Sequence, residues 1–131
     1  MKINHIGYVV KSIDKSVIFY CSNLSYEIKV NNIYVSNQDV YITMLKSIHG
    51  GPDLELITPA SKTSPAYNAL GKGSVINHIC YQVKNYDYLL QLFKNKIVRK
   101  SMPAPFELFN GASTFFAFID NQVTEFVEDY V

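Results

Sequence analysis

The sequence contains no tryptophan, has almost no net charge, and lacks any long run of apolar residues. Its 131 residues include 12 Lys and Arg against 11 Asp and Glu, which gives a formal net charge of +1. This balance gives no electrostatic reason to expect nucleic acid or an anionic membrane as a partner. No segment approaches the roughly 20 apolar residues that a membrane-spanning helix needs. We therefore expect no binding to nucleic acid and no membrane span.

Cysteine is also scarce. The chain has only Cys21 and Cys80, which lie far apart and form no CxxC spacing. We interpret both as reduced thiols that face the core, because cytosolic proteins keep their thiols reduced. The first residues, Met1 to His5, lack the apolar segment of a signal peptide. These features favour a cytoplasmic location.

The residues that are abundant favour a folded, β-rich protein. Hydrophobic residues make up 48% of the chain and charged residues 18%, which permits a core and argues against disorder. Ten Tyr and eight Phe favour β-structure. The length fits one domain, so we expect a single domain over residues 1–131.

The chain repeats itself. Residues 3–11 read Ile-Asn-His-Ile-Gly-Tyr-Val-Val-Lys, and residues 76–84 read Ile-Asn-His-Ile-Cys-Tyr-Gln-Val-Lys. Seven of these nine positions are identical at an offset of 73, which indicates a duplicated unit. We expect two modules, at about residues 1–59 and 75–131, joined by a linker over residues 60–74.

Each copy is followed by one helical pattern and then by three β-type segments, which predicts the order βαβββ twice. Ser12 and Asp14 can cap the first helix and Asn85 the second, and the apolar stripe of the first helix is expected at Ile13, Val17, Ile18 and Cys21. The linker is expected to contain a short helix from Pro65 to Leu70, ended by Gly71. The strands after the helices are expected at residues 26–35, 39–46 and 53–58, and then at 97–101, 112–119 and 123–128. Residues 102–105 contain two prolines and are expected to form a loop or a sheet edge.

A histidine stands early in each half and a glutamate on the last strand of each half. These pairs are His5 with Glu55, and His78 with Glu125. A carboxylate on the inner face of a strand is costly unless it is paired or bound to a metal. Two imidazoles and two carboxylates suit one divalent ion, and an octahedral ion would keep two open positions, as catalytic sites do. The alternative is that each histidine caps a local turn and each glutamate is a solvated strand residue.

Aromatic side chains lie on the middle strands of both halves. We expect Tyr41, Phe115 and Phe116 to line the cavity and to contact the substrate. Most other aromatic residues on these strands are expected in the core.

These motifs resemble the vicinal oxygen chelate superfamily, which includes glyoxalase I, methylmalonyl-CoA epimerase, extradiol dioxygenases, and fosfomycin and bleomycin resistance proteins. The resemblance spans nearly the whole chain. It implies an α+β fold in which two βαβββ modules form a half-open, cup-shaped mixed β-sheet with the helices outside. The residues that carry it are Asn4 to Val10, Leu54 to Pro59, Ser64-Pro65, Asn77 to Val83 and Val123 to Phe126.

The nearest branches are glyoxalase I and methylmalonyl-CoA epimerase. The resemblance implies a glyoxalase I-like (lactoylglutathione lyase-like) proton transfer through a metal-bound enediolate, with Glu125 as base and Glu55 as second acid or base. The ion would be Ni, Co, Zn, Mn or Mg, and the substrate a small carbonyl compound or thioester. Epimerases usually carry Gln at the position of Glu55 and an acidic base at a position that aligns with Tyr41.

Several alternatives stay open. One is an acyl-CoA epimerase, and another is a non-enzymatic module that binds a small molecule or an antibiotic. An iron extradiol dioxygenase is disfavoured by chain length, and a fosfomycin-type thiol transferase by the few cations on the cavity strands. We expect a homodimer, because half-open barrels have edges that need covering. The metal site then lies within one chain or is shared by two.

Overall fold

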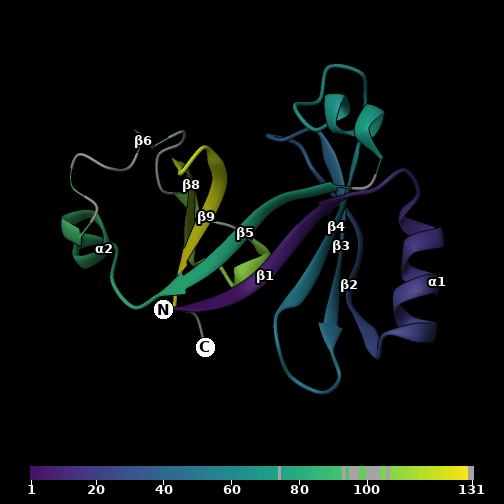
Figure 1. The fold of residues 1–131 in the computed structure, drawn as a ribbon, viewed down its shortest axis with the longest axis horizontal. Helices are drawn as coiled ribbons and strands as arrows, with labels where there is room; N and C mark the ends of the chain where they lie inside the picture. Colours follow the sequence, from purple (N-terminus) through teal and green to yellow (C-terminus); the bar gives the residue numbers. More distant parts are fainter. Residues whose placement is uncertain (74, 93, 95–97, 100–103, 106, 130–131) are drawn as a thin grey trace. The chain divides into compact units, whose positions relative to one another are not determined.

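The computed structural model describes residues 1–73, 75–92, 94, 98–99, 104–105 and 107–129 (Figure 1). The chain divides into two compact units. The N-terminal unit is His5–Asn77, and the C-terminal unit joins Met1–Asn4 to His78–Val131. The elements, in chain order, are β1 (Lys2–Val9), α1 (Ile13–Asn23), β2 (Tyr26–Val35), β3 (Val40–Ser47), β4 (Asp53–Pro59), the 3₁₀ helix η1 (Tyr67–Lys72), β5 (Val75–Val83), α2 (Tyr86–Leu92), β6 (Val98–Arg99), β7 (Ala104–Pro105), the 3₁₀ helix η2 (Glu107–Phe109), β8 (Ser113–Ile119) and β9 (Gln122–Glu128).

In the N-terminal unit the strands lie in the order β2-β3-β4-β1 (Figure 1). β1 and β4 are parallel, whereas the other neighbours are antiparallel. Helix α1 begins after Ser12, whose side chain accepts a hydrogen bond from the backbone N–H of Lys15 at 3.3 Å, as the capping prediction requires. One sheet face packs under α1 through an apolar cluster of Val10, Ile13, Leu45, Leu54 and Leu56.

The prediction for Ile18 is wrong. Its side chain is 66% exposed, and the buried side of α1 is instead formed by Ile13, Val17, Tyr20 and Cys21. These four positions lie one turn apart on one helix face, and Ile18 lies beside that face rather than on it.

In the C-terminal unit the strands lie in the order β5-β9-β8-β6, and β7 adds a two-residue pairing to β8. β5 and β9 are parallel, and β8 is antiparallel to its partners. The Asn85 side chain caps α2 by accepting from the backbone N–H of Asp87 at 2.7 Å and from that of Tyr88 at 3.2 Å. The core under α2 is a cluster of Val83, Tyr86, Leu89, Phe115, Ala117 and Phe126.

A two-residue turn fixes how β8 pairs with β9. Asp120 and Asn121 have φ of 51° and 60°, the left-handed conformation that a type I′ hairpin requires at both central positions. Ile119 therefore pairs with Gln122, and Phe116 pairs with Glu125 further along the ladder. The predicted turn is confirmed.

The predicted α+β class is confirmed, and the first module has the βαβββ order. The second module has the same order, with the short strand β7 inserted between β6 and β8. Of the predicted strand at residues 97–101, Val98 and Arg99 form β6, whereas residues 97, 100 and 101 lie outside the described residues, as do residues 102 and 103. Ala104–Pro105 form the short edge pairing β7, in agreement with the expected loop or edge.

The predicted short helix of the linker is present, but its predicted bounds are wrong. A 3₁₀ helix runs over Tyr67–Lys72 and is followed by Gly73, which has a φ of 83°. The cause is a turn at Ser64, whose hydroxyl accepts from the N–H of Ala66 at 3.3 Å and whose carbonyl accepts from that of Tyr67 at 3.0 Å. This turn uses the residues that were expected to start the helix. Among the described helices, none has the length and apolarity to cross a lipid bilayer.

Candidate metal centre

The first histidine–glutamate pair lies on neighbouring parallel strands of the N-terminal unit. Gly7 of β1 stands beside Glu55 of β4 in the register, and His5 lies two residues before Gly7. Side chains two residues apart on a strand share a face, so His5 and Glu55 point to the same side. His5 Nε2 lies 3.4 Å from Glu55 Oε2. The predicted pairing of these two residues is thus present.

The second pair repeats this arrangement in the C-terminal unit. Cys80 of β5 stands beside Glu125 of β9, and His78 lies two residues before Cys80. His78 Nε2 lies 3.1 Å from Glu125 Oε2. Each module therefore uses its first and last strands in the same register to bring one imidazole against one carboxylate.

All four side chains are buried. The exposed fractions are 0% for His5, 4% for Glu55, 3% for His78 and 2% for Glu125. Burial of an ionised carboxylate is unfavourable by several kcal/mol unless a partner compensates for the lost hydration. The alternative in which the glutamates are solvated strand residues is therefore wrong.

Glu125 has a further partner that Glu55 does not share. Thr114 of β8 donates from its hydroxyl to Glu125 Oε1 at 2.7 Å, which leaves Oε2 toward His78. The ring of Phe116 meets the His78 imidazole edge-on, with 5.4 Å between ring centroids. Sequence reasoning missed Thr114.

The equivalent positions around Glu55 are apolar. Met44 pairs with Glu55 as Phe116 pairs with Glu125, and Ile42 occupies the position that corresponds to Thr114. Both are almost completely buried. The two carboxylates therefore stand in different surroundings, although the strands that hold them match.

The structure separates the three predicted substrate-binding residues. Phe116 is on the same face of its sheet as Glu125 because the two are register partners. Phe115 is on the opposite face, fully buried under α2 between Tyr86 and Phe126, so its predicted place in the cavity is corrected to the core. Side-chain alternation along the strand is the cause.

Tyr41 is also on the opposite face from the glutamate of its unit. It pairs with Thr58, three residues beyond Glu55, and lines a small hollow beside the start of α1 together with Ser12 and Asn32. The prediction that Tyr41 lies on the cavity face with Glu55 is therefore wrong. The residues of β3 that share a face with Glu55 are Ile42 and Met44.

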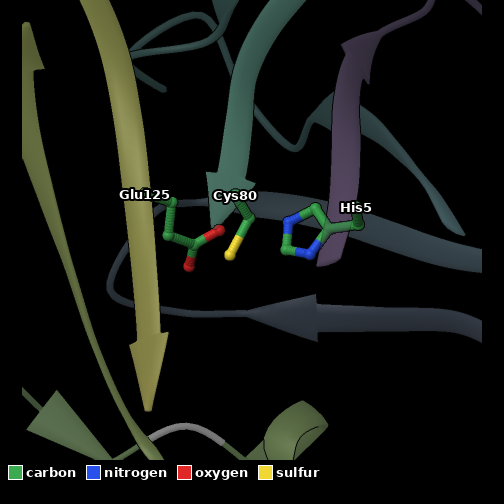
Figure 2. A group of neighbouring side chains, drawn as sticks. All are labelled: His5, Cys80 and Glu125. Carbon is green, nitrogen blue, oxygen red and sulfur yellow. The ribbon is translucent and has the colours of Figure 1, made fainter. Parts of the chain in front are cut away.

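Cys80 was expected to be a reduced thiol facing the core. It forms no disulfide and is fully buried. Its sulfur lies within 4.8 Å of a carboxylate oxygen of Glu125, and Figure 2 shows the two side chains reaching toward each other from β5 and β9.

The donors suit a divalent ion. Imidazole nitrogen and carboxylate oxygen together are the ligand set that Zn, Co, Ni and Mn accept, and burial removes competing water. Each unit contributes one imidazole and one carboxylate within 3.4 Å of each other. The donors of each pair, His5 with Glu55 and His78 with Glu125, are therefore of the kinds that a divalent ion accepts.

The family follows from the sequence. Residues 4–118 match the family described as the glyoxalase/bleomycin resistance protein/dioxygenase superfamily. The chain belongs to this superfamily. No curated protein matches the chain significantly.

Several solved structures are similar to this chain in fold. A hypothetical protein from Bacillus halodurans is 28% identical, with a TM-score of 0.83, and the match covers 99% of this chain and 95% of that one. Methylmalonyl-CoA epimerase from Mycobacterium tuberculosis is 17% identical with a TM-score of 0.85, covering 99% and 89%. A Streptomyces coelicolor methylmalonyl-CoA epimerase in complex with 2-nitronate-propionyl-CoA is 22% identical with a TM-score of 0.81, covering 100% and 99%. At these identities the epimerases share a fold with this superfamily member and do not fix its reaction.

Proposed function

We propose that this superfamily member is a divalent-metal-dependent enzyme that transfers a proton next to a carbonyl group, in the manner of glyoxalase I. One observation carries the proposal: each module buries one imidazole against one carboxylate at the same register position. A buried, duplicated donor set of this kind suits a metal centre far better than a structural core.

The ligands would be His5, Glu55, His78 and Glu125, held on β1, β4, β5 and β9. A bound divalent ion would supply Lewis-acid stabilisation of the negative charge that develops on a carbonyl oxygen of the substrate. A carboxylate within reach of the substrate carbon accepts and returns the proton.

Glu125 is the better base of the two carboxylates. The hydroxyl of Thr114 fixes Oε1 of Glu125. Oε2, which lies beside His78, would therefore be the oxygen that accepts the substrate proton. The ring of Phe116 packs against His78 and would help to exclude water from the pair. Glu55 lies among Ile42 and Met44 and would serve as ligand and second acid or base.

An acyl-CoA epimerase is the second candidate, supported by solved epimerases of the same fold that carry CoA thioesters. Epimerases of this superfamily use a second acidic residue on the strand before the first Glu or Gln ligand. That strand is β3, Val40–Ser47, which contains no Asp or Glu. We therefore favour the glyoxalase-like reaction, in which a single carboxylate can take and return the proton.

The test is exchange of substrate hydrogen with solvent. Protein loaded with Ni, Co, Zn, Mn or Mg is incubated in deuterium oxide with a glutathione hemithioacetal and, in parallel, with methylmalonyl-CoA. We expect deuterium in the product of the hemithioacetal, and loss of this exchange in Glu125→Gln. Glu27→Gln is the matched control because Glu27 is exposed on β2. Exchange only with the thioester would favour the epimerase, and no exchange with either would contradict both.

A non-enzymatic binding module is the remaining alternative. It predicts tight binding of a small molecule without any exchange and without dependence on the metal. Elemental analysis of His78→Ala beside His49→Ala separates the two, since His49 is exposed in a loop. Equal metal content in both variants would contradict the proposed centre.

We also propose that the protein forms a homodimer, since sheet edges of half-open barrels need covering. Light scattering of the purified protein measures its mass. Mixing refolded His5→Ala protein with refolded Glu125→Gln protein tests where the ligands come from. Recovery of activity in the mixture indicates a site shared between chains, and absence of recovery indicates a site within one chain.

A further inference from the structure

The C-terminal unit has a cavity of about 580 Å³ beside the start of α2. Its walls come from the start of β1, the end of β5, the first turn of α2 and Asp129, all of which belong to that unit (Figure 1). Small-molecule sites in proteins have volumes of roughly 300–1,000 Å³, so the cavity is large enough for a small ligand. The residues under α2 are on the sheet face opposite to Glu125, so this cavity is separate from the His78–Glu125 pair.

The cavity has an apolar floor and an apolar rim. Val83 and Leu89 line it, are at most 5% exposed, and belong to the core cluster under α2. Met1 and Tyr88 line it as well and are 68% and 63% exposed. Single exposed apolar side chains are ordinary on protein surfaces, whereas apolar side chains gathered around one hollow are typical of a binding surface. A flat apolar ligand in this cavity would shield them from water.

Two lysines give the cavity a positive charge. Lys2 and Lys84 both line it, and neither forms an ion pair with any residue that the structure describes. Asp129 is the one acidic residue among the described residues of the lining, and its carboxylate accepts a hydrogen bond from Gln82 Nε2 at 2.7 Å. Two lysines against one aspartate leave a formal charge of +1. This charge complements a ligand with one anionic group.

Asn85 adds a hydrogen-bond donor with a fixed direction. Its Oδ1 is occupied, because it accepts from the backbone N–H of Asp87 at 2.7 Å and from that of Tyr88 at 3.2 Å. The carboxamide NH₂ is therefore the group that Asn85 offers to a ligand in the cavity that it lines. Because capping holds the side chain in place, this donor is oriented before a ligand arrives.

We propose that this cavity is a second ligand site, which binds a small aromatic monocarboxylate independently of the metal centre. The ring of the ligand packs on Tyr88 and Leu89, and its charge is compensated by the two lysines. A single carboxylate matches the formal charge of +1, whereas a ligand with several phosphates would keep uncompensated negative charge. The exposed ring of Tyr88 offers a flat face that suits an aromatic ligand better than an aliphatic chain.

The experiment is a fluorescence titration of the full chain with 8-anilinonaphthalene-1-sulfonate, an aromatic anion that reports apolar sites. Competition with 2-naphthoate, with the neutral 2-naphthamide and with octanoate then separates the contributions of charge and ring. We expect naphthoate to displace the probe at a concentration about tenfold lower than the amide or octanoate requires. Chelated protein and Zn-loaded protein should bind naphthoate equally.

Two substitutions on the surface test the lining. Lys84→Gln and Tyr88→Ala should each weaken naphthoate binding by about three- to tenfold. Both side chains are exposed, so the fold should not depend on them. The matched controls are Lys62→Gln and Tyr34→Ala, which change exposed residues of the N-terminal unit and should leave the affinity unchanged.

Nuclear magnetic resonance of the wild type locates the ligand without any variant. Naphthoate should shift the methyl resonances of Val83 and Leu89. Shifts confined to other residues would overturn the proposal, as would equal displacement by the acid and the amide. Affinity that is lost on chelation would mean that the acid binds a metal instead, which overturns this second site and leaves the proposed function intact. Failure of naphthoate to displace the probe, or unchanged affinity in both Lys84→Gln and Tyr88→Ala, would also overturn it.

Discussion

Thr114 and Glu125 are joined by a hydrogen bond of 2.7 Å from the Thr114 hydroxyl to Oε1, whereas Ile42 stands at the corresponding place beside Glu55. The duplicated halves thus differ in how they hold their carboxylates. A hydroxyl donor holds one oxygen of Glu125 in a fixed orientation. Glu55 has an aliphatic neighbour there instead. This difference supports the proposal that the two acids have different tasks.

Replacing Thr114 with valine should slow the reaction while the metal stays bound. Valine keeps the shape and removes the donor, so Glu125 loses its fixed orientation. We expect kcat to fall by about 10- to 100-fold, the equivalent of one hydrogen bond to a charged group. Steady-state kinetics and elemental analysis measure both quantities. Thr124→Val, on the opposite face of β9, should leave kcat nearly unchanged. A drop in metal content that matches the drop in kcat would contradict an orienting role.

Removing the metal should lower the melting temperature. A ligand that binds only the folded chain at about 100 times its dissociation constant contributes about 2.7 kcal/mol, which corresponds to a shift of roughly 10 °C for a protein of this size. Differential scanning calorimetry before and after chelation measures the shift. Re-adding the ion should restore the transition in the wild type and in His49→Ala but not in His78→Ala. An unfolding transition whose midpoint temperature does not change on chelation would contradict a stabilising contribution of the metal.

Neighbouring aromatic residues on β8 should behave in opposite ways. Phe115→Ala removes a fully buried ring between Tyr86 and Phe126 and should lower the free energy of unfolding by about 3–5 kcal/mol. Phe116→Leu keeps most of the apolar volume, so its cost should stay below about 1.5 kcal/mol, while kcat/KM falls because the His78 edge loses its cover. Denaturant titrations and kinetics on both variants test this contrast. Equal losses of stability would contradict the assignment of the two faces.

Tyr86 should make stability fall at high pH. Burial raises the pKa of Tyr86 above its ordinary value, and its hydroxyl donates to the carbonyl oxygens of Ser113 and Phe126, the latter at 3.0 Å. A raised pKa means that the unfolded chain ionises first. The contribution is therefore complete below about pH 10 and is lost as pH rises toward the folded pKa. The free energy of unfolding, measured by denaturant titration across this range, should decline above about pH 10.

Tyr86→Phe is the variant that isolates this effect. It should be less stable at neutral pH by about 1 kcal/mol and should show a shallower alkaline decline. Tyr88→Phe is the control on the same helix, because Tyr88 is largely exposed. If the two variants decline with the same slope as the wild type, the buried hydroxyl does not control alkaline stability.

Much of this architecture could be predicted because it is local or repeated. The duplicated motif around His5 and His78 predicted two modules, and polar turn residues such as Asp120 and Asn121 predicted where strands end. Strand alternation then placed each histidine on the face of its glutamate. These are properties of short segments, and the fold preserves them.

The misplaced residues share one cause. Tyr41 and Phe115 were located on the right strands and on the wrong faces, because moving a register by one residue sends every side chain to the other side. The hairpin at Asp120-Asn121 contains the missing information. Counting back from a two-residue turn pairs Phe116 with Glu125 and brings Thr114 to the same face, so Thr114 was predictable from turn geometry. No two-residue hairpin turn precedes the linker helix. The start of that helix depends instead on the turn in which the Ser64 hydroxyl accepts from the N–H of Ala66.

In both modules the histidine lies on the first strand and the glutamate on the last strand, and these two strands pair in parallel. An unfolded chain therefore keeps the two ligands of a pair far apart, and they meet only after the intervening helix and strands have closed. An ion bound to both ligands would link the first and last strands of the module. Its slow release would retard unfolding more than the loss of any single contact in the cores. Metal supply during synthesis would then set how long the finished protein lasts in the cell.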